Sequence, residues 1–102
     1  MEKHNHLQMK FTKNGPNKVK SDQGFTLWMR NPFQLHYFEG DHELVVPGEM
    51  LTGETELLVS VSTIKNWKPP HDAEVIAPWK KQQIIANIEA ALKFMGIRAE
   101  FD

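Results

Sequence analysis

The sequence predicts an α+β domain, with an antiparallel sheet of about five strands, one C-terminal amphipathic helix packed on a face of the sheet, and a last strand. Two patterns carry this prediction. Between residues 25 and 64, apolar and polar residues tend to alternate, which is typical of half-buried strands. From residue 78 to residue 95, apolar residues recur at three- and four-residue steps, which is typical of an amphipathic helix.

The N-terminal segment differs in composition from the rest of the chain. Residues 1–24 are polar, are interrupted by Asn14-Gly15-Pro16, and show no sustained strand or helix period. We therefore predict a flexible basic N-terminal arm over residues 1–24, with at most a short strand around Leu7–Thr12. The single α+β domain is predicted over residues 25–102.

Short strands are predicted on both sides of a tight turn. Phe25–Met29 is an apolar run that ends at Asn31-Pro32. Phe33–Phe38 and Glu43–Val46 then flank the sequence Glu39-Gly40-Asp41-His42, in which glycine supplies the unusual backbone angle of a hairpin turn. These two segments are therefore expected to pair as a hairpin.

The register of this hairpin follows from the length of its turn. If the two central residues form the turn, Tyr37 faces Leu44 and Phe38 faces Glu43. One face then collects four apolar side chains and is the better core face: Leu35, Tyr37, Leu44 and Val46. The opposite face is predicted to be more polar.

The stretch from Glu56 to Pro70 is predicted to contain a long central strand and its exit. The residues expected on one side of this strand are Leu57, Val59, Val61 and Thr63. Lys68-Pro69-Pro70 ends the strand region, because proline lacks the backbone donor that a sheet requires. Trp67 is expected to be largely buried where the strand leaves the sheet, near the helix.

The helix is predicted to begin at Pro78, since a proline in the first turn does not need its missing donor. Its apolar stripe consists of Ile84, Ile85, Ile88, Ala91, Leu92 and Met95. Gly96 is predicted as the C-terminal cap. The alternation that follows, in Ile97, Ala99 and Phe101, predicts a final strand that returns to the sheet.

Composition narrows the class of protein. The chain has 102 residues and no cysteine, which excludes disulfides, thiolate metal sites and cysteine nucleophiles, and favours a reducing compartment. No apolar run approaches the roughly 20 residues that a membrane helix needs. The first residues contain no hydrophobic segment of the signal-peptide type. We therefore expect a cytoplasmic protein without a membrane partner.

No constellation of catalytic or ligating residues is recognisable. His4 and His6 form a His-x-His pair, but no further ligand lies at a useful spacing. His36 and His42 lie on opposite faces of the predicted hairpin and would not converge on one ion. There is no phosphate-binding loop, no dinucleotide-binding glycine turn and no His-Glu-x-x-His motif. The sequence therefore predicts no enzyme activity, no catalytic or cofactor-binding residue and no metal ligand.

The formal net charge of −1 conceals two oppositely charged segments. Residues 1–30 have a balance of +4, whereas residues 39–56 have a balance of −6 with no lysine or arginine. The acidic side chains of the second segment are the candidate partner-binding residues: Glu39, Asp41, Glu43, Glu49, Glu54 and Glu56. They form either a solvated acidic edge or a binding surface for a basic partner.

The basic arm suggests an alternative function, that of a small accessory domain that binds nucleic acid. Clustered lysines with aromatic residues can bind single strands through charge and stacking. The acidic hairpin would repel phosphate, however, and Trp28, Trp67 and Trp79 are not embedded in a run of basic residues. Nucleic acid is therefore the less favoured partner.

Part of the chain resembles the immunity protein 74 family, small bacterial proteins encoded beside polymorphic toxins. The resemblance is carried by Leu35-His36-Tyr37, Glu39-Gly40, Leu44-Val45-Val46-Pro47, Glu49, Ile64 and Trp67-Lys68-Pro69-Pro70. The Trp-x-Pro-Pro sequence after a strand is the most specific of these features. The resemblance continues through an isoleucine-rich helix and an apolar last strand, and covers about residues 33–101.

The resemblance implies a non-enzymatic inhibitor that binds and neutralises a cognate toxin domain in the cytoplasm of the producing cell. Toxins that act on nucleic acid tend to have basic clefts, and a complementary acidic surface favours fast and selective association. The expected partner is therefore a basic toxin domain, such as a nuclease, bound through the acidic rim of the hairpin.

Overall fold

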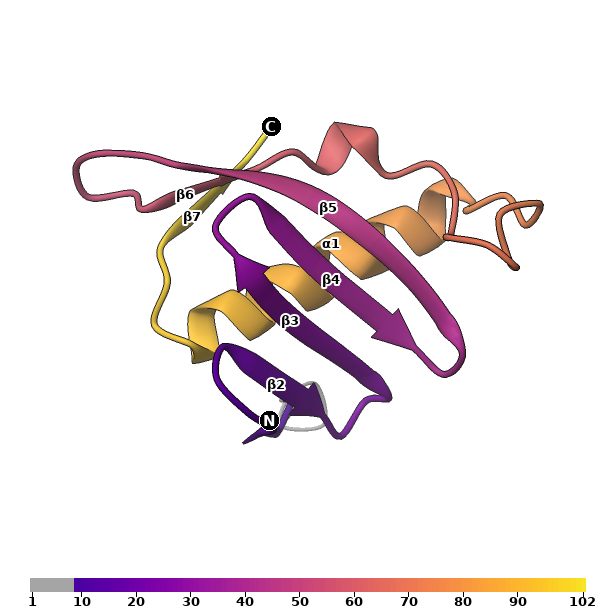
Figure 1. Cartoon of the computed structure of the whole chain (residues 1–102), viewed down its shortest axis with the longest axis horizontal. Helices are drawn as coiled ribbons and strands as arrows, with labels where there is room; N and C mark the ends of the chain where they lie inside the picture. The colour runs from indigo at the N-terminus through magenta and orange to yellow at the C-terminus, as the bar shows by residue number, and fades with distance from the viewer. Residues whose placement is uncertain (1–8) are drawn as a thin grey trace, which may run out of the picture.

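The computed structural model describes residues 9–102, which form a curled seven-stranded sheet and one α-helix (Figure 1). The strands follow one another across the sheet in chain order. Their bounds are β1 Phe11–Lys13, β2 Lys18–Ser21, β3 Phe25–Asn31, β4 Gln34–Glu39, β5 His42–Met50, β6 Leu57–Val59 and β7 Ala99–Phe101. A 3₁₀-helix, η2, spans Val61–Thr63, and α1 spans Pro78–Phe94. The predicted α+β class is thus confirmed.

The sheet is larger than predicted and is not wholly antiparallel. It has seven strands instead of about five, and β6 and β7 pair in parallel. The parallel pair arises because α1 lies between these strands in the chain and crosses behind β3 and β4 (Figure 1), so that β7 returns alongside β6 in the same direction. Alternation of apolar residues fits either direction of pairing, which is why the sequence did not distinguish them.

The hairpin β4–β5 has the predicted register. Tyr37 pairs with Leu44 and Phe38 pairs with Glu43, and Gly40 in the turn has φ of 59°. The predicted core face is also confirmed, because each of its four side chains is at most 3% exposed: Leu35, Tyr37, Leu44 and Val46. This hairpin forms the centre of the sheet.

A flexible arm was predicted over residues 1–24, and the structure differs from this prediction over residues 9–24. These residues contain β1 and β2, which extend the sheet next to β3. Val19 on β2 is 1% exposed and belongs to the core, while Lys20 is exposed and Lys18 places its ammonium group over the Trp28 ring. One buried valine between two lysines is too short an alternation to recognise from the sequence. Residues 1–8, including His4 and His6, lie outside the described residues.

The long central strand predicted from Glu56 to Ile64 ends at Val59. Ser60 leaves the extended conformation with φ of −88° and ψ of 75°, and the Thr63 hydroxyl donates a hydrogen bond to the Ser60 carbonyl at 2.7 Å. The resulting 3₁₀ turn places Val61 and Ile64, three residues apart, in the core. The Thr63 hydroxyl, whose side chain was expected on the same strand side as Val59 and Val61, therefore supports a turn instead.

Helix α1 has the predicted start, buried face and cap. It begins at Pro78, and its fully buried apolar residues are Ile84, Ile88, Ala91 and Leu92. Gly96 follows with φ of 78°, and the Ile97 amide donates to the Leu92 carbonyl at 2.9 Å, which is the hydrogen bond of a Schellman cap. Within residues 9–102, no helix is both long and apolar enough to cross a membrane.

Gly48 allows β5 to exchange one partner strand for another. Residues up to Pro47 pair with β4, and residues from Gly48 onward pair with β6. A Cβ atom at Gly48 would lie 2.6 Å from the Pro32 carbonyl oxygen. We therefore expect Gly48→Ala to lower the free energy of unfolding by about 1–3 kcal/mol, because backbone must move to admit the methyl group. Urea denaturation measures this change, and the exposed neighbour Glu49→Ala, with an expected change near zero, is the control.

Candidate functional site

The six candidate acidic residues form two groups. Glu39, Asp41 and Glu43 lie at the β4–β5 turn, whereas Glu49, Glu54 and Glu56 lie at or beyond the opposite end of β5. Nine residues of β-strand span on the order of 25–30 Å, and Figure 1 shows the two ends of β5 on opposite sides of the molecule. The single acidic rim expected from the sequence is therefore divided. We call Glu49, Glu54 and Glu56 the far-end group.

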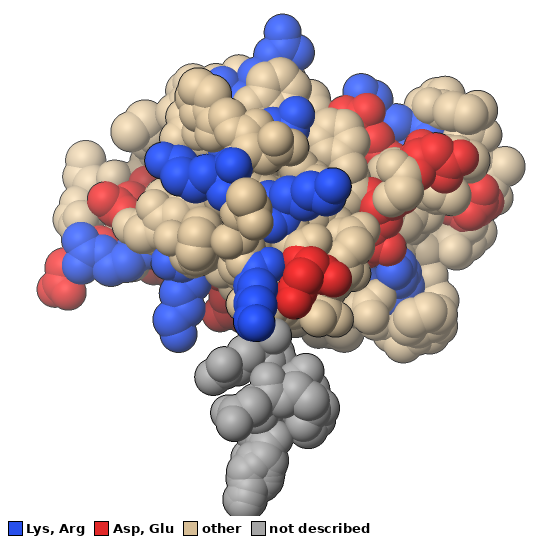
Figure 2. Space-filling view, turned by 90° about the horizontal axis from the view of Figure 1, so that it is seen from below, with Lys and Arg blue, Asp and Glu red and all other residues tan. Residues whose placement is uncertain are grey.

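The far-end group has few internal partners. Glu56 accepts a hydrogen bond from the backbone amide of Arg98 at 3.1 Å. Glu49 and Glu54 are exposed and form no ion pair within residues 9–102. At the other end, Figure 2 shows the largest group of acidic side chains on the side of the molecule that carries the β4–β5 turn, with Lys and Arg side chains over the middle.

Glu39 connects the hairpin to the helix. Its carboxylate lies 2.6 Å from Lys80 Nζ of α1 and accepts a hydrogen bond from the Tyr37 hydroxyl. The Tyr37 hydroxyl oxygen in turn accepts a hydrogen bond from Asn87 Nδ2 at 2.8 Å. Burial, together with the neighbouring Glu39 carboxylate, raises the pKa of Tyr37, so the phenol remains protonated and donates. Glu39 is therefore primarily a structural residue.

The Glu43 side chain lies on the other face of the hairpin, where it pairs with His36 and Lys68. Its Oε2 lies 3.0 Å from His36 Nδ1 and 3.5 Å from Lys68 Nζ. The hydrogen bond with His36 and the nearby Lys68 charge lower the pKa of Glu43. His36 is 7% exposed, and its Nε2 has no hydrogen-bond partner within the described part of the chain. His36 and His42 lie on opposite faces, as predicted.

The pH dependence of stability follows from the lowered pKa of Glu43. A carboxylate whose pKa is lower in the folded state stabilises the fold above its unfolded pKa, here 4.5, and that contribution is lost as the pH falls through the folded pKa. We expect the parent to melt at a higher temperature than Glu43→Gln at neutral pH. This difference should shrink progressively below about pH 4.5. Parallel melts across pH measure it, and a difference that stays constant would contradict the assignment.

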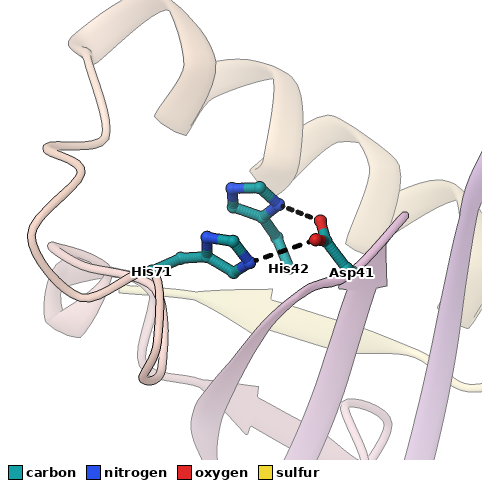
Figure 3. Close-up of side chains that lie close together, drawn as sticks. All are labelled: Asp41, His42 and His71. Atoms are coloured by element: carbon teal, nitrogen blue, oxygen red, sulfur yellow. Dashed lines mark hydrogen bonds and ion pairs between the residues drawn. The ribbon is translucent and has the colours of Figure 1, made fainter.

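Asp41 belongs to a cluster with two histidines and Glu74. Asp41 Oδ1 lies 2.9 Å from His42 Nδ1, and Asp41 Oδ2 lies 3.3 Å from His71 Nε2 (Figure 3). Behind them, Glu74 Oε1 is 2.9 Å from His42 Nε2 and Glu74 Oε2 is 2.9 Å from His71 Nδ1. The two imidazole rings stack with centroids 3.7 Å apart. We call these four residues the histidine–carboxylate cluster.

Hydrogen bonds shift the pKa values within this cluster. The bond with Glu74 is the main cause that raises the pKa of His42. The bond with His42 lowers the pKa of Asp41, and bonds with both histidines lower the pKa of Glu74. The charged forms of all three groups are therefore favoured.

The loop before α1 brings His71 to the turn. The Lys68 amide donates to the Glu43 carbonyl at 2.7 Å, and Asn66 and Val75 form a β-bridge at the base of the loop. His71 therefore lies beside His42, although 28 residues separate them in the chain. Sequence reasoning named neither histidine as a functional residue, because only the return of this loop brings them together. Asp41, His42 and His71 each place a potential ligand atom within 4.8 Å of the others, so this set could hold a metal ion.

Large apolar side chains are exposed beside this cluster. Trp79 is 71% exposed and Val75 is 82% exposed. Both line an open hollow together with Glu39, His42 and Glu74. The turn-end surface, as we define it, comprises Glu39, Asp41, Glu43, Asp72, Glu74, Val75 and Trp79. It combines carboxylates with an exposed aromatic ring, which is suited to binding a protein.

The hydroxyl groups of Ser21 and Ser62 are hydrogen-bonded to a backbone amide and a carboxylate, respectively. Ser62 Oγ donates to Asp102 at 3.3 Å, and Ser21 Oγ accepts from the Gln23 amide. Within residues 9–102, no serine hydroxyl is hydrogen-bonded to a histidine, which a serine nucleophile would need as its base.

A small α+β domain with charged and large apolar side chains exposed at one end is the class that this fold and site define. The model of the family described as Immunity protein 74 matches residues 33–102, which is more than half of the chain. The chain therefore belongs to the immunity protein 74 family. The match begins just before β4, so β1, β2 and β3 precede it. No curated protein and no solved structure matches the chain.

Proposed function

We propose that this protein neutralises a cognate toxin domain by binding it, without catalysing a reaction, and that the turn-end surface contacts the toxin. Membership of an immunity protein family supports the binding role. The observation that carries the choice of surface is Trp79, which is 71% exposed next to an acidic group. Exposed tryptophan residues are rare on free surfaces and frequent among the residues that dominate binding energy.

The charge of this surface suits a basic partner. Three hairpin carboxylates and two loop carboxylates lie at this end, against the lysines Lys68 and Lys80 that pair with them. A basic toxin domain, such as a nuclease with a phosphate-binding cleft, would complement this excess of negative charge. Neutralisation would then take place in the cytoplasm of the producing cell, where the toxin domain would act.

The nucleic-acid alternative is less well supported than the toxin-binding function. The basic residues around β2 and β3 do surround an aromatic ring, that of Trp28. Lys18 Nζ lies 5.6 Å and Arg30 Cζ 5.8 Å from the centre of that ring. These cations occupy the ring that a base would need for stacking.

The direct test is co-expression with the toxin domain encoded beside this gene. We expect the protein to restore growth of cells that express the toxin domain, and the two chains to elute together in size-exclusion chromatography. Nucleic acid should not bind the purified protein at physiological salt. Binding of single-stranded nucleic acid, without complex formation or protection from the toxin, would contradict the proposal and favour the alternative.

A charge variant tests which end of the molecule faces the toxin. Asp72 lies on the turn-end loop, and its side chain forms no ion pair within residues 9–102, so Asp72→Lys should leave the fold intact. We expect this variant to slow association about three- to tenfold at low salt, with a smaller effect at high salt, because rim charges act on the association rate. Glu54→Lys, in the far-end group, is the matched control. If Glu54→Lys slows association and Asp72→Lys does not, the toxin binds the far end.

A further inference from the structure

When both rings are neutral, the form in which histidine binds a metal, the histidine–carboxylate cluster has fewer protons than contacts. Each of the four ring nitrogens of His42 and His71 faces a carboxylate oxygen, at distances between 2.9 and 3.3 Å. A neutral imidazole carries one N–H, so two neutral rings supply two donors for four contacts. Two contacts then bring a nitrogen lone pair against a carboxylate oxygen, which is repulsive unless an additional positive charge, either a second ring proton or a metal ion, lies between them.

The arrangement of Glu74 indicates where that charge would lie. Glu74 faces His42 Nε2 and His71 Nδ1, both at 2.9 Å, and can accept the single proton of each ring. The lone pairs then reside on His42 Nδ1 and His71 Nε2, which are the nitrogens directed toward Asp41 in Figure 3. Two imidazole lone pairs and a carboxylate therefore converge on one small region at the turn.

We propose that Asp41, His42 and His71 bind a divalent transition-metal ion of the zinc type, with Glu74 orienting both imidazoles. Zinc binds histidine nitrogen and carboxylate oxygen at about 2.0–2.2 Å in tetrahedral geometry, which places ligand atoms about 3.3–3.5 Å apart. Asp41 Oδ1 lies 2.9 Å from His42 Nδ1, Asp41 Oδ2 lies 3.3 Å from His71 Nε2, and a ligand atom of each residue lies within 4.8 Å of the others. Side-chain movements of about an ångström would therefore bring three such atoms to the separations of a zinc site.

The chemistry of the ligands selects the class of metal. Imidazole nitrogen favours zinc, nickel, copper or cobalt, whereas calcium and magnesium prefer oxygen ligands only. A carboxylate that accepts the remaining N–H of each metal-bound histidine is the usual support for such a site, and Glu74 does this for both rings. One divalent ion would also balance the two carboxylate charges of the cluster. Three protein ligands leave one tetrahedral position for water.

Such an ion would cross-link two separate parts of the chain. Asp41 and His42 belong to the β4–β5 turn, and His71 belongs to the loop that precedes α1. The ion would therefore fix this loop, which carries the exposed Val75, against the hairpin. The metal site is independent of whether the protein binds a toxin, and its test requires no toxin.

The test uses the full chain, stripped of metal with a chelator and titrated near neutral pH. We expect isothermal titration with Zn²⁺ to give one ion per chain with micromolar or tighter affinity and a higher melting temperature for the loaded protein. Co²⁺ should give the visible absorption of a tetrahedral site. His71→Ala should lose this binding, and Glu74→Gln should weaken it about 10- to 100-fold.

His4 and His6, which are two residues apart in the sequence, provide the control. The double variant His4→Ala plus His6→Ala removes that pair, and it should bind Zn²⁺ as the parent does. Three results would overturn the proposal: a parent that binds no Zn²⁺ at micromolar concentrations, binding that survives in His71→Ala, or binding that disappears in the His4/His6 variant. Should His71→Ala be unfolded by circular dichroism, His42→Gln replaces it, with loss of binding expected and retained binding overturning the site.

Discussion

Trp67→Ala is expected to lower the free energy of unfolding by about 3–5 kcal/mol, the range for removing a large aromatic side chain from a core. Trp67 is 7% exposed. Its ring stacks at 6.5 Å from Tyr37 and meets His42 edge-on at 5.0 Å. The substitution would remove both aromatic contacts and leave a cavity where the loop of residues 68–76 leaves the core.

Chemical denaturation followed by circular dichroism measures this loss. Trp79→Ala is a matched control, because it removes the same side chain from a position that is 71% exposed. We expect Trp79→Ala to unfold within about 0.5 kcal/mol of the parent, as surface substitutions usually do. Equal losses in the two variants, or a Trp67→Ala variant as stable as the parent, would contradict the assignment of Trp67 to the core.

The parts of the fold that the sequence predicted are those set by local chemistry. The turn Glu39–His42 fixes its own register through Gly40, so the pairing of Tyr37 with Leu44 could be derived from turn length alone. The helix was similarly accessible, because Pro78 marks its start and Gly96 its end. Burial of Trp67 followed from its place between a strand and two prolines.

The features that the sequence did not predict depend on contacts between distant segments. The end of β6 at Val59 results from hydrogen bonds around Ser60, which compete with extended pairing only when the chain can turn there. The parallel pairing of β7 depends on the path of α1 behind the sheet. Strand β2 pairs with β3 and β1 pairs with β2, and β2 contributes a single strongly buried apolar side chain, that of Val19.

In the candidate site too, the sequence did not show which distant residues lie together. Proximity in sequence suggested that six acidic residues form one rim, but a strand of nine residues separates them into two groups. Conversely, His42 and His71 are far apart in the sequence and stack in the fold at 3.7 Å. The positions of charged residues along the sequence show neither effect, because they do not indicate which distant segments meet in the folded chain.

Trp79→Ala is expected to weaken binding of the cognate toxin about 30- to 1000-fold, which corresponds to about 2–4 kcal/mol for an aromatic residue at the centre of an interface. The ring is exposed in the free protein, so its burial against a partner would remove a large apolar area from water. The loss should appear mainly as faster dissociation, whereas Asp72→Lys should act mainly on association.

Phe33→Ala is the matched control for this measurement. Phe33 is an aromatic residue that is 62% exposed. Its backbone carbonyl accepts a hydrogen bond from the Gly48 amide, which places Phe33 toward the end of β5 that carries the far-end group. Surface plasmon resonance with the toxin domain should show a large increase in dissociation rate for Trp79→Ala and little change for Phe33→Ala. Because Trp79→Ala is expected to retain the stability of the parent, its loss of affinity would report a contact and not a folding defect. The opposite result, with Phe33→Ala weakened and Trp79→Ala unchanged, would place the toxin at the far end of β5, beside Glu49 and Glu54.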